Sequence, residues 1–474
     1  MVRWYCVAET ARSGHKLPSM LTLPDQATPE NRILWDVVED HFNESAYEFG
    51  RWGAALRSPR YLLREVADGP EESLCAHLQG VLLAGEAGFE RMVLPHLQCP
   101  PEDEPAMLAV AGALALRSGN RPHLVPLLWE GEAVQRQAII QGLRLCDDAG
   151  FDAWSIDIFR RGFMAESPRI AMLELAADRG LNLGALEASL VSASAAEASI
   201  AAKAAAWSER RLHLPMLEDL LSHPALEVRL AALETALVWG SKRAWRCCLD
   251  LVEAHASEAL ELLDFVAILG GPEQHSLLAR LFSASHERTL YAAIRASGLS
   301  GNVGFVTALL GHVRAADPLA SRLAGEAIAL LTGFPADQTK HHREAPVLSE
   351  EEEARLALPE LEDEDLDADL GHQEEEELPY LDAESVASWW RARMDTSDST
   401  RPTLLGQPIS SEICLTALHS GSMRRRRALA RRIWIGSGGR ATIAVDRPTS
   451  YQCSNLSRLA TTDLVSGNSL AAWR

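Results

Sequence analysis

The residues of this sequence that could carry out acid–base chemistry are a few histidines with a carboxylate near them. His41 and Glu44 are three residues apart, which places both on one face of a helix. His77 follows in the short segment Ala-His-Leu. A catalytic site would need these groups to converge on a cleft with a nucleophile or a metal ion. We interpret them instead as polar groups that cap or bridge the first helices.

The spacing of histidine and cysteine does not predict a metal site. His341 and His342 are adjacent, but the sequence around them supplies no further ligands, so we expect them to begin a solvated linker. A zinc site needs closely grouped ligands, and no Cys-x-x-Cys pair is present. The eight cysteines are Cys6, Cys75, Cys99, Cys146, Cys247, Cys248, Cys414 and Cys453. We therefore expect no bound metal and free thiols, as in a cytoplasmic protein.

The motifs of common enzyme and membrane-protein classes are missing from the sequence. It contains no phosphate-binding loop, no dinucleotide-binding loop, no His-Glu-x-x-His and no Gly-x-Ser-x-Gly. No apolar run approaches the roughly 18 residues of a transmembrane helix, and residues 1–30 lack the apolar core of a signal peptide. We therefore expect a cytoplasmic protein that is not an enzyme, binds no cofactor and does not contact a membrane.

Acidic side chains are concentrated in one short segment. Residues 344–384 hold 18 Asp and Glu residues against one cation, Arg355, and so contribute −17 of the net charge of −21. Repulsion among clustered carboxylates predicts a flexible linker, and such linkers often serve only solubility. The segment would also complement a basic partner and speed its association. The residues that we predict to contact a partner are Glu350, Glu351, Glu352, Glu353, Asp363, Glu364, Asp365, Glu374, Glu375, Glu376 and Glu377.

A basic helix is predicted after the acidic segment. The sequence RRRRALARRIWI, residues 424–435, combines two arginine clusters with apolar residues at helical spacing. These cations could contact nucleic acid, but we expect them to face the acidic segment of their own chain or to lie solvated. Residues 1–343 carry about twelve excess negative charges, which argues against nucleic-acid binding by that part of the chain.

Glycines that recur about every thirty residues indicate the elements that must position these groups. The intervals are 34, 31, 30, 60, 30 and 31 residues, and Arg210 stands where the double interval lacks a glycine. The glycines are Gly85, Gly119, Gly150, Gly180, Gly240, Gly270 and Gly301. Each separates two apolar helical segments, which is typical of helix–turn–helix repeats. We therefore predict an all-α fold, an α-solenoid of about eight HEAT-like repeats that presents long surfaces to other macromolecules.

The most regular unit, residues 223–255, shows how neighbouring units should pack. Its first helix ends before Gly240, and its second contains Trp245, which we expect to pack between units. Small residues stand eight and four positions before the turn in three units: Ala111 and Ala115, Ala232 and Ala236, and Ala293 and Ser297. Small side chains on one face of a helix allow the next helix to approach closely.

Changes in composition divide the chain into six segments. We predict a flexible extension over residues 1–30, an N-terminal helical cap over 31–70 and the repeat array over 71–340. An acidic linker over 341–384 and a C-terminal helical repeat over 385–440 follow, the latter with a helix capped by Ser410. Residues 441–474 are expected to form an irregular tail with one strand at 442–445.

Three segments together resemble a proteobacterial family of long helical-repeat proteins whose genes often lie beside type VI secretion effector genes. LWDVVEDHFNESAYEFGRWGAALRSPRYLL, residues 34–63, is similar to the family's N-terminal helix and turn. ESLCAHLQGVLLAG, residues 72–85, is similar to its Ala-His-Leu-x-Gly-Leu core. LPYLDAESVASWW and LLGQPISSEICLTALHSGSMRRRRALA, within residues 378–430, resemble its C-terminal signature. The tail after Gly439 matches this family poorly.

The resemblance implies a binding function. The gene neighbourhood of the family implies that some members are immunity proteins, each of which silences a toxin encoded beside it. We therefore expect a cytoplasmic immunity protein that neutralises a cognate type VI effector, a DNase in the favoured case, through one-to-one binding. A curved stack of second helices would wrap the toxin domain and occlude its active site. The alternative is a scaffold or adaptor for effector loading or for assembly of the secretion machine.

Overall fold

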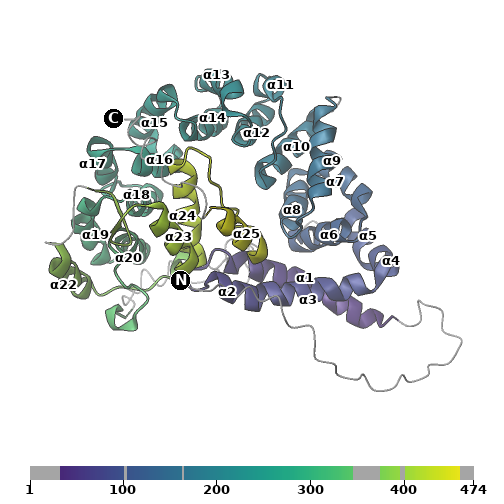
Figure 1. The fold of residues 1–474 in the computed structure, drawn as a ribbon, viewed down its shortest axis with the longest axis horizontal. Helices are drawn as coiled ribbons and strands as arrows, with labels where there is room; N and C mark the ends of the chain where they lie inside the picture. Colours follow the sequence, from purple (N-terminus) through teal and green to yellow (C-terminus); the bar gives the residue numbers. More distant parts are fainter. Residues whose placement is uncertain (1–32, 101–103, 163–164, 345–373, 395–400, 460–474) are drawn as a thin grey trace, which may run out of the picture.

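The computed structural model describes residues 33–100, 104–162, 165–344, 374–394 and 401–459. Within these ranges the protein is almost wholly helical, which confirms the all-α, solenoid-like fold (Figure 1). The extension predicted over residues 1–30 lies outside the described residues. None of the described helices combines the length and the apolar character that a bilayer-spanning helix requires.

The N-terminal cap is built around one long amphipathic helix. Helix α1 (Trp35–Ala55) is followed by the short α2 (Leu63–Val66) and the π-helical turn η2 (Ala67–Glu71). The apolar side of α1 buries Phe42 and Trp52 against the first helices of the array, α3 and α6. The cap therefore closes one end of the apolar core, as terminal units of repeat proteins must.

The array consists of paired helices, as the glycine period predicted. Its N-terminal half contains α3 (Glu72–Leu83), α4 (Gly85–Gly88), η3 (Phe89–Val93), α5 (Leu94–Gln98), α6 (Pro105–Arg117), η4 (Arg121–His123), α7 (Leu124–Glu130), α8 (Ala133–Leu143), α9 (Ala149–Arg160), α10 (Glu166–Arg179), α11 (Glu187–Leu190), α12 (Ala195–Ala205) and α13 (Arg210–Leu220). Its C-terminal half contains α14 (Leu226–Val238), α15 (Lys242–His255), η5 (Ala256–Glu258), α16 (Leu262–Leu269), α17 (Pro272–Leu281), α18 (Glu287–Leu299), η6 (Val303–Phe305), α19 (Val306–Val313) and α20 (Pro318–Thr332).

The first helix of each unit lines the inner side of the curve. Figure 1 shows α6, α8, α10, α12, α14, α16, α18 and α20 along the concave side, with the second helices outside them. The prediction that second helices form the inner wall was therefore wrong. The first helices carry the small residues that permit close packing, so they occupy the shorter inner arc of the curved stack.

The small residues and glycines of the repeat mostly act as predicted. The six small residues before the turns are all fully buried. Gly85, Gly119, Gly180, Gly240 and Gly301 adopt positive φ, the conformation that ends a helix and reverses the chain. Gly150 and Gly270 do not. Instead, Gly150 lies in the first turn of α9, while a Cβ atom on Gly270 would lie 2.3 Å from the Val266 carbonyl oxygen.

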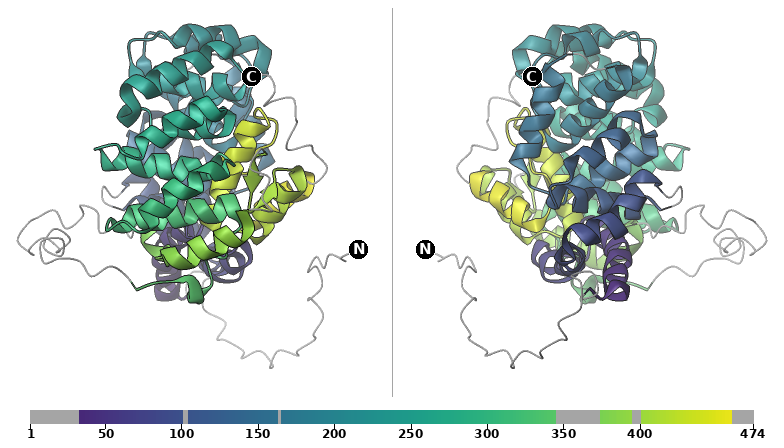
Figure 2. Two further views of the ribbon diagram at one scale, coloured as in Figure 1. Left: turned by 90° about the vertical axis from the view of Figure 1, so that its left-hand side faces the viewer. Right: turned by 90° about the vertical axis from the view of Figure 1, so that its right-hand side faces the viewer.

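The C-terminal elements do not add one more repeat to the array. They are η7 (Thr339–His341), η8 (Glu374–Glu377), α22 (Ala383–Met394), β1 (Thr403–Leu404), β2 (Gln407–Pro408), α23 (Ser411–Ser420), α24 (Met423–Gly436) and α25 (Thr449–Leu459). Helix α22 packs beside α19, whereas α24 packs against α14, α16 and α18 and lies inside the curve in Figure 1. The side views of Figure 2 show the last helices, in yellow, on one side of the array. The predicted repeat over 385–440 is thus divided between two places.

Two local predictions for the C-terminal part differ in outcome. Ser410 caps α23, since its hydroxyl oxygen accepts a hydrogen bond from the Ile413 amide at 3.2 Å. The strand expected at 442–445 does not form, and the tail expected to be irregular contains α25. Leu456 and Leu459 of that helix are buried in a cluster with Leu429 of α24. Tertiary packing therefore stabilises a helix in a Ser/Thr-rich sequence of low helix propensity.

Candidate functional site

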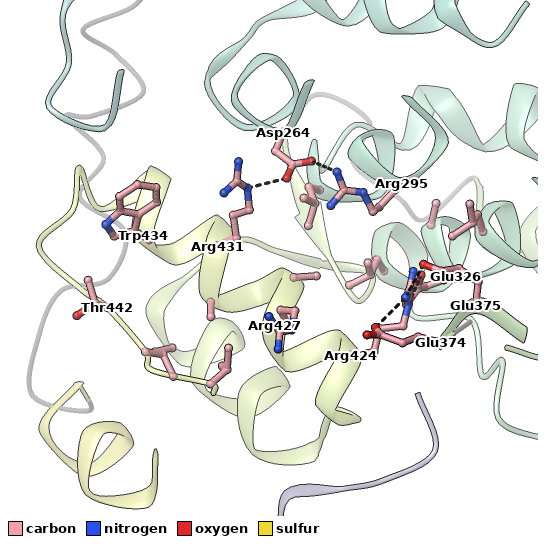
Figure 3. Close-up of a pocket in the computed structure, with 18 of the residues that line it drawn as sticks. Asp264, Arg295, Glu326, Glu374, Glu375, Arg424, Arg427, Arg431, Trp434 and Thr442 are labelled. Atoms are coloured by element: carbon pink, nitrogen blue, oxygen red, sulfur yellow. Dashed lines mark hydrogen bonds and ion pairs between the residues drawn. The ribbon is translucent and has the colours of Figure 1, made fainter. Parts of the chain in front are cut away.

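The candidate site is the contact between the basic helix α24 and the inner wall of the array (Figure 3). Ser422 caps α24 by accepting a hydrogen bond from the Arg425 amide at 3.4 Å. Leu429 and Ile433 face the C-terminal core and are almost fully buried. Two of the arginines on the other faces of α24, Arg424 and Arg431, are thereby directed toward the array. An arginine-rich helix can occupy this position only if the opposing wall supplies carboxylates.

A cavity of about 630 Å³ is lined by residues of α24 and of helices α16, α18 and α20. Its apolar lining includes Leu299, Leu323 and Trp434, and its charged lining contains four arginines and four carboxylates. The arginines are Arg295, Arg424, Arg427 and Arg431, and the carboxylates are Asp264, Glu326, Glu374 and Glu375. The lining is therefore balanced in charge, and its ion pairs hold two distant parts of the chain together.

Arg431 forms the centre of this contact. Its Nε donates to Asp264 Oδ2 at 2.7 Å, and its Nη2 donates to Glu234 Oε1 at 3.2 Å. Asp264 is 1% exposed and is also paired with Arg295, whose Nη2 lies 3.3 Å from Oδ1. Burial raises the pKa of Glu234, although Arg431 opposes this shift. A buried carboxylate is costly without a cation, and Arg431 and Arg295 together compensate the charges of Asp264 and Glu234.

Arg424 joins α24 to the acidic segment. Its Nε donates to both oxygens of Glu326, at 3.0 and 3.1 Å, and its Nη1 donates to Glu375 Oε1 at 2.9 Å. Glu374 lies 3.6 Å from the same Nη1 and also pairs with Arg57 Nε at 2.7 Å. Arg424 thus faces the acidic segment of its own chain, as predicted, and these pairs connect the segment to the N-terminal cap as well.

Two arginines of α24 are buried without a carboxylate. The guanidinium of Arg426 donates to the Leu418 carbonyl and to Gln452 Oε1, the latter at 2.9 Å, and the residue is fully buried. Arg432 is 6% exposed, and its Nη1 has no hydrogen-bond partner among the described residues. Burial lowers the pKa of each to about 10. The prediction of a solvated or acid-facing helix does not account for these two side chains.

The predicted partner-binding residues divide into two groups. Glu350–Glu353 and Asp363–Asp365 lie outside the described residues. Glu374 and Glu375 make the ion pairs described above, Glu377 accepts a hydrogen bond from the Ser58 hydroxyl, and Glu376 is exposed. The described ends of the predicted linker, 341–344 and 374–384, therefore pack against the array and differ from a flexible linker.

The histidines also take defined places. His41 Nδ1 lies 3.1 Å from His77 Nδ1, which joins α1 to α3 as the bridging interpretation predicted, while Glu44 is exposed. His341 was expected to be solvated, but its ring packs 4.8 Å from that of Phe334 and its Nδ1 lies 2.6 Å from the Ser385 hydroxyl. Within the described ranges, no three His, Cys, Asp or Glu side chains are grouped as metal ligands.

Asp264 and Glu234 were not predicted from the sequence to be the partners of Arg431. One signal was available, since Asp264 is the single charge in the apolar helix LLDFVAIL, residues 262–269. A charge there must be paired when the helix is buried on all sides. The pattern does not reveal the partner, which lies 167 residues further along the chain.

Comparisons with known proteins add only a distant structural likeness. No family model and no curated protein matches this chain. The chain is similar to the crystal structure of an engineered protein solved by a structural genomics consortium, with 16% sequence identity. The match covers 84% of this chain and 98% of that chain, at a TM-score of 0.31.

Proposed function

We propose that this protein is an immunity factor, which binds a type VI effector toxin with one-to-one stoichiometry and silences it. The observation that carries the proposal is the curved array of paired helices, an architecture whose extended surfaces suit protein partners. The identity of the partner class comes from the sequence resemblance. A DNase is favoured, because its DNA-binding cleft must be basic and this chain has a net charge of −21.

Helix α24 already covers part of the inner face of the array, which limits where the toxin can bind. Since α24 lies on the inner face of α14, α16 and α18, we place the toxin elsewhere. Glu350–Glu353 and Asp363–Asp365 remain proposed contacts. Glu374 and Glu375 are engaged with Arg424 and Arg57 and serve instead to hold the acidic segment.

The exposed face of α1 is a second acidic surface that suits a basic partner. Asp36, Glu39, Asp40 and Glu44 fall within about 140° of the helix circumference, since successive residues are about 100° apart. All four are exposed, and none has an ion-pair partner among the described residues. Tyr47 lies on the same face and is 64% exposed, with the guanidinium of Arg51 over part of its ring, 5.8 Å from the centroid. Carboxylates around an exposed aromatic ring are suited to a cationic surface with an apolar centre.

The test uses the purified full chain and the toxin domain encoded beside it. Nuclease activity, titrated with increasing chain, should fall linearly and end at one equivalent. Full activity in the presence of excess folded chain would overturn the proposal. Binding to the effector outside its toxin domain, with activity unchanged, would favour the adaptor function instead.

A charge variant tests the α1 face. Replacing Asp36 and Asp40 by Asn, and Glu39 and Glu44 by Gln, should slow association and reduce its dependence on salt. Asp250→Asn with Glu258→Gln, Glu273→Gln and Glu287→Gln, which removes the same number of exposed carboxylates from α15, η5, α17 and α18, is the matched control and should leave association unchanged. Equal effects of the two sets would show that only net charge matters.

A further inference from the structure

A second cavity lies where the C-terminal segment crosses the N-terminal units. It has a volume of about 300 Å³ and is bounded by residues of α3, the end of α6, the turn after α8 and the start of α25. Helix α25 also packs against α2 and η2 (Figure 1). A ligand in this cavity would therefore touch both the beginning of the array and the end of the described chain.

Arg447 is the unusual group in the wall of this cavity. It is 6% exposed, and the only hydrogen bond of its side chain to the described residues runs from Nη2 to the Cys146 carbonyl at 3.2 Å. Its Nε and Nη1 have no partner among the described residues. The guanidinium stacks on the Tyr451 ring, 4.7 Å from the ring centroid. Burial, reinforced by the nearby Arg179, lowers its pKa.

The carboxylates near Arg447 do not neutralise it. Glu71 is fully used elsewhere, since it accepts hydrogen bonds from the Thr449 amide, the Thr449 hydroxyl and Trp52 Nε1. Asp147 is exposed and forms no ion pair with Arg447 in the described structure. A buried cation with free donors is costly. The Cys146 carbonyl is also shared with Arg179 Nη1 and Nη2, both at 3.3 Å, so it cannot compensate for two charges.

We propose that this cavity binds a small anion with carboxylate or phosphate oxygens. One of its oxygens would accept a charge-assisted hydrogen bond from a free N–H group of Arg447, after a small turn of the side chain, since Nε and Nη1 are almost fully covered in this structure. Arg117 lines the same cavity from the opposite element and supplies a second cation, and the exposed hydroxyl of Ser450 can donate as well. The volume suits an organic dianion or a phosphate better than a halide.

The position of the site gives the anion a structural consequence. Arg117 belongs to the end of α6, whereas Arg447 and Ser450 belong to the C-terminal segment. An anion held between them would join these two parts and oppose their separation. An anion that binds the folded protein but not the unfolded chain stabilises the fold by RT ln(1 + [L]/Kd), where [L] is the concentration of free anion. This inference concerns a small molecule and does not depend on the proposed toxin partner.

The test is calorimetric titration of the full chain with inorganic phosphate and, separately, with citrate, each at constant ionic strength, with chloride as the reference anion. One-to-one binding of either probe, with slower amide exchange of α25, is the expected result. A response to only one probe would identify the phosphate or the carboxylate as the preferred group. Absence of binding by both, or binding no different from that of chloride, would overturn the proposal.

Three variants locate the site. Arg447→Gln should lower the affinity by about tenfold or more, because charge-assisted hydrogen bonds are lost. Arg117→Gln, at an exposed position that the fold does not require, should lower it by about threefold to tenfold. Asp147→Asn removes a repelling charge and should raise it. Binding that is unaltered in Arg117→Gln and Asp147→Asn would contradict the assignment even if Arg447→Gln failed to fold.

Discussion

The two halves of the array use their charges in different ways. In the N-terminal half, ion pairs join neighbouring units: Arg136 to Glu174 at 3.2 Å, and Arg169 to Glu197 at 2.8 Å. In the C-terminal half, Asp264 also pairs with Arg295 of the next unit, but Asp264 and Glu234 are in addition bound by Arg431 of α24, 167 and 197 residues away. The first half is thus held together by contacts about one repeat apart. The second half depends in addition on α24, which is far from it in the sequence.

The apolar core shows the same division. One cluster covers the cap and the units up to α10, and a second covers the units from α10 onward, with α10 contributing to both. Met172 belongs to the first cluster and Leu173 to the second. The second cluster includes Ile435 of α24 and Val386 of α22. Removing contacts of α24 should therefore weaken the C-terminal half more than the N-terminal half.

The largest effect is expected from Arg431→Ala. The change leaves Glu234 and the buried Asp264 with less compensation, and breaking a buried ion pair costs about 3 kcal/mol of unfolding free energy. Denaturant unfolding measures this loss. Arg427→Ala on the same helix is the control, since both Arg427 and its partner Asp446 are substantially exposed and such pairs contribute less than about 1 kcal/mol. Equal losses in the two variants would contradict the role assigned to Arg431.

A smaller loss is expected in the N-terminal half from Gly142→Ala. A Cβ atom there would lie 1.8 Å from the Ala109 carbonyl oxygen, so α6 and α8 would have to move apart. Overpacking of this kind costs about 2 kcal/mol. Gly50→Ala in α1 is the control, because nothing lies within 4 Å of its added Cβ and the change should stabilise the helix by up to about 1 kcal/mol. Thermal unfolding of both variants tests this: a lower melting temperature in Gly142→Ala only would show that crowding between α6 and α8 causes the loss, whereas equal losses in both variants would contradict it.

Arg169→Ala should cost about 1.5 kcal/mol, because it leaves Glu197, 1% exposed, with only neutral donors such as Ser192. Arg169 is the largest cause of the lowered pKa of Glu197. A lowered folded-state pKa contributes stability above the unfolded value of about 4.5 and loses it as pH falls further. The variant should therefore lose less stability than the wild type between pH 5 and 3. Denaturant unfolding of both proteins at each pH measures this difference. An equal loss of unfolding free energy in the variant and the wild type over this pH range would contradict the role of Arg169.

The smallest effect concerns His275, whose pKa is lowered by burial. Its Nε2 donates to the Ala267 carbonyl at 3.0 Å, so its Nδ1 is free to accept from Asn302 Nδ2 at 3.1 Å. Protonation would remove that acceptor. Because the folded-state pKa lies below the unfolded value of about 6.5, stability should fall as pH drops below 6.5, by less than about 1.4 kcal/mol per unit. In His275→Gln, the urea concentration at the unfolding midpoint should depend less on pH between pH 7 and 5.5 than in the wild type. The same dependence on pH in both proteins would contradict this role.

The fold was predictable from the sequence where it depends on local pattern. The glycine period and the small residues such as Ala232 and Ala236 specify paired helices and their close packing, because both are properties of neighbouring residues. The inner position of the first helices was not predictable in this way, since either helix of a pair can line the curve.

The site was less predictable, because it depends on contacts across most of the chain. The arginine cluster of α24 was evident, and its pairing with the acidic segment was expected for Arg424. For Asp264, the only signal in the sequence was that it is the single charged residue of an apolar helix. Helix α25 has low intrinsic propensity, and Thr449 at its start is held by Glu71, 378 residues earlier. Such contacts leave no periodic signal in the sequence.

Helix α24 is fixed on the inner face of the C-terminal half of the array. Hydrogen–deuterium exchange of the full chain, followed peptide by peptide, tests it directly. We expect amides of residues 423–436 to exchange as slowly as those of α14, α16 and α18, against which they pack. Rapid exchange of 423–436, with slow exchange in those three helices, would contradict it.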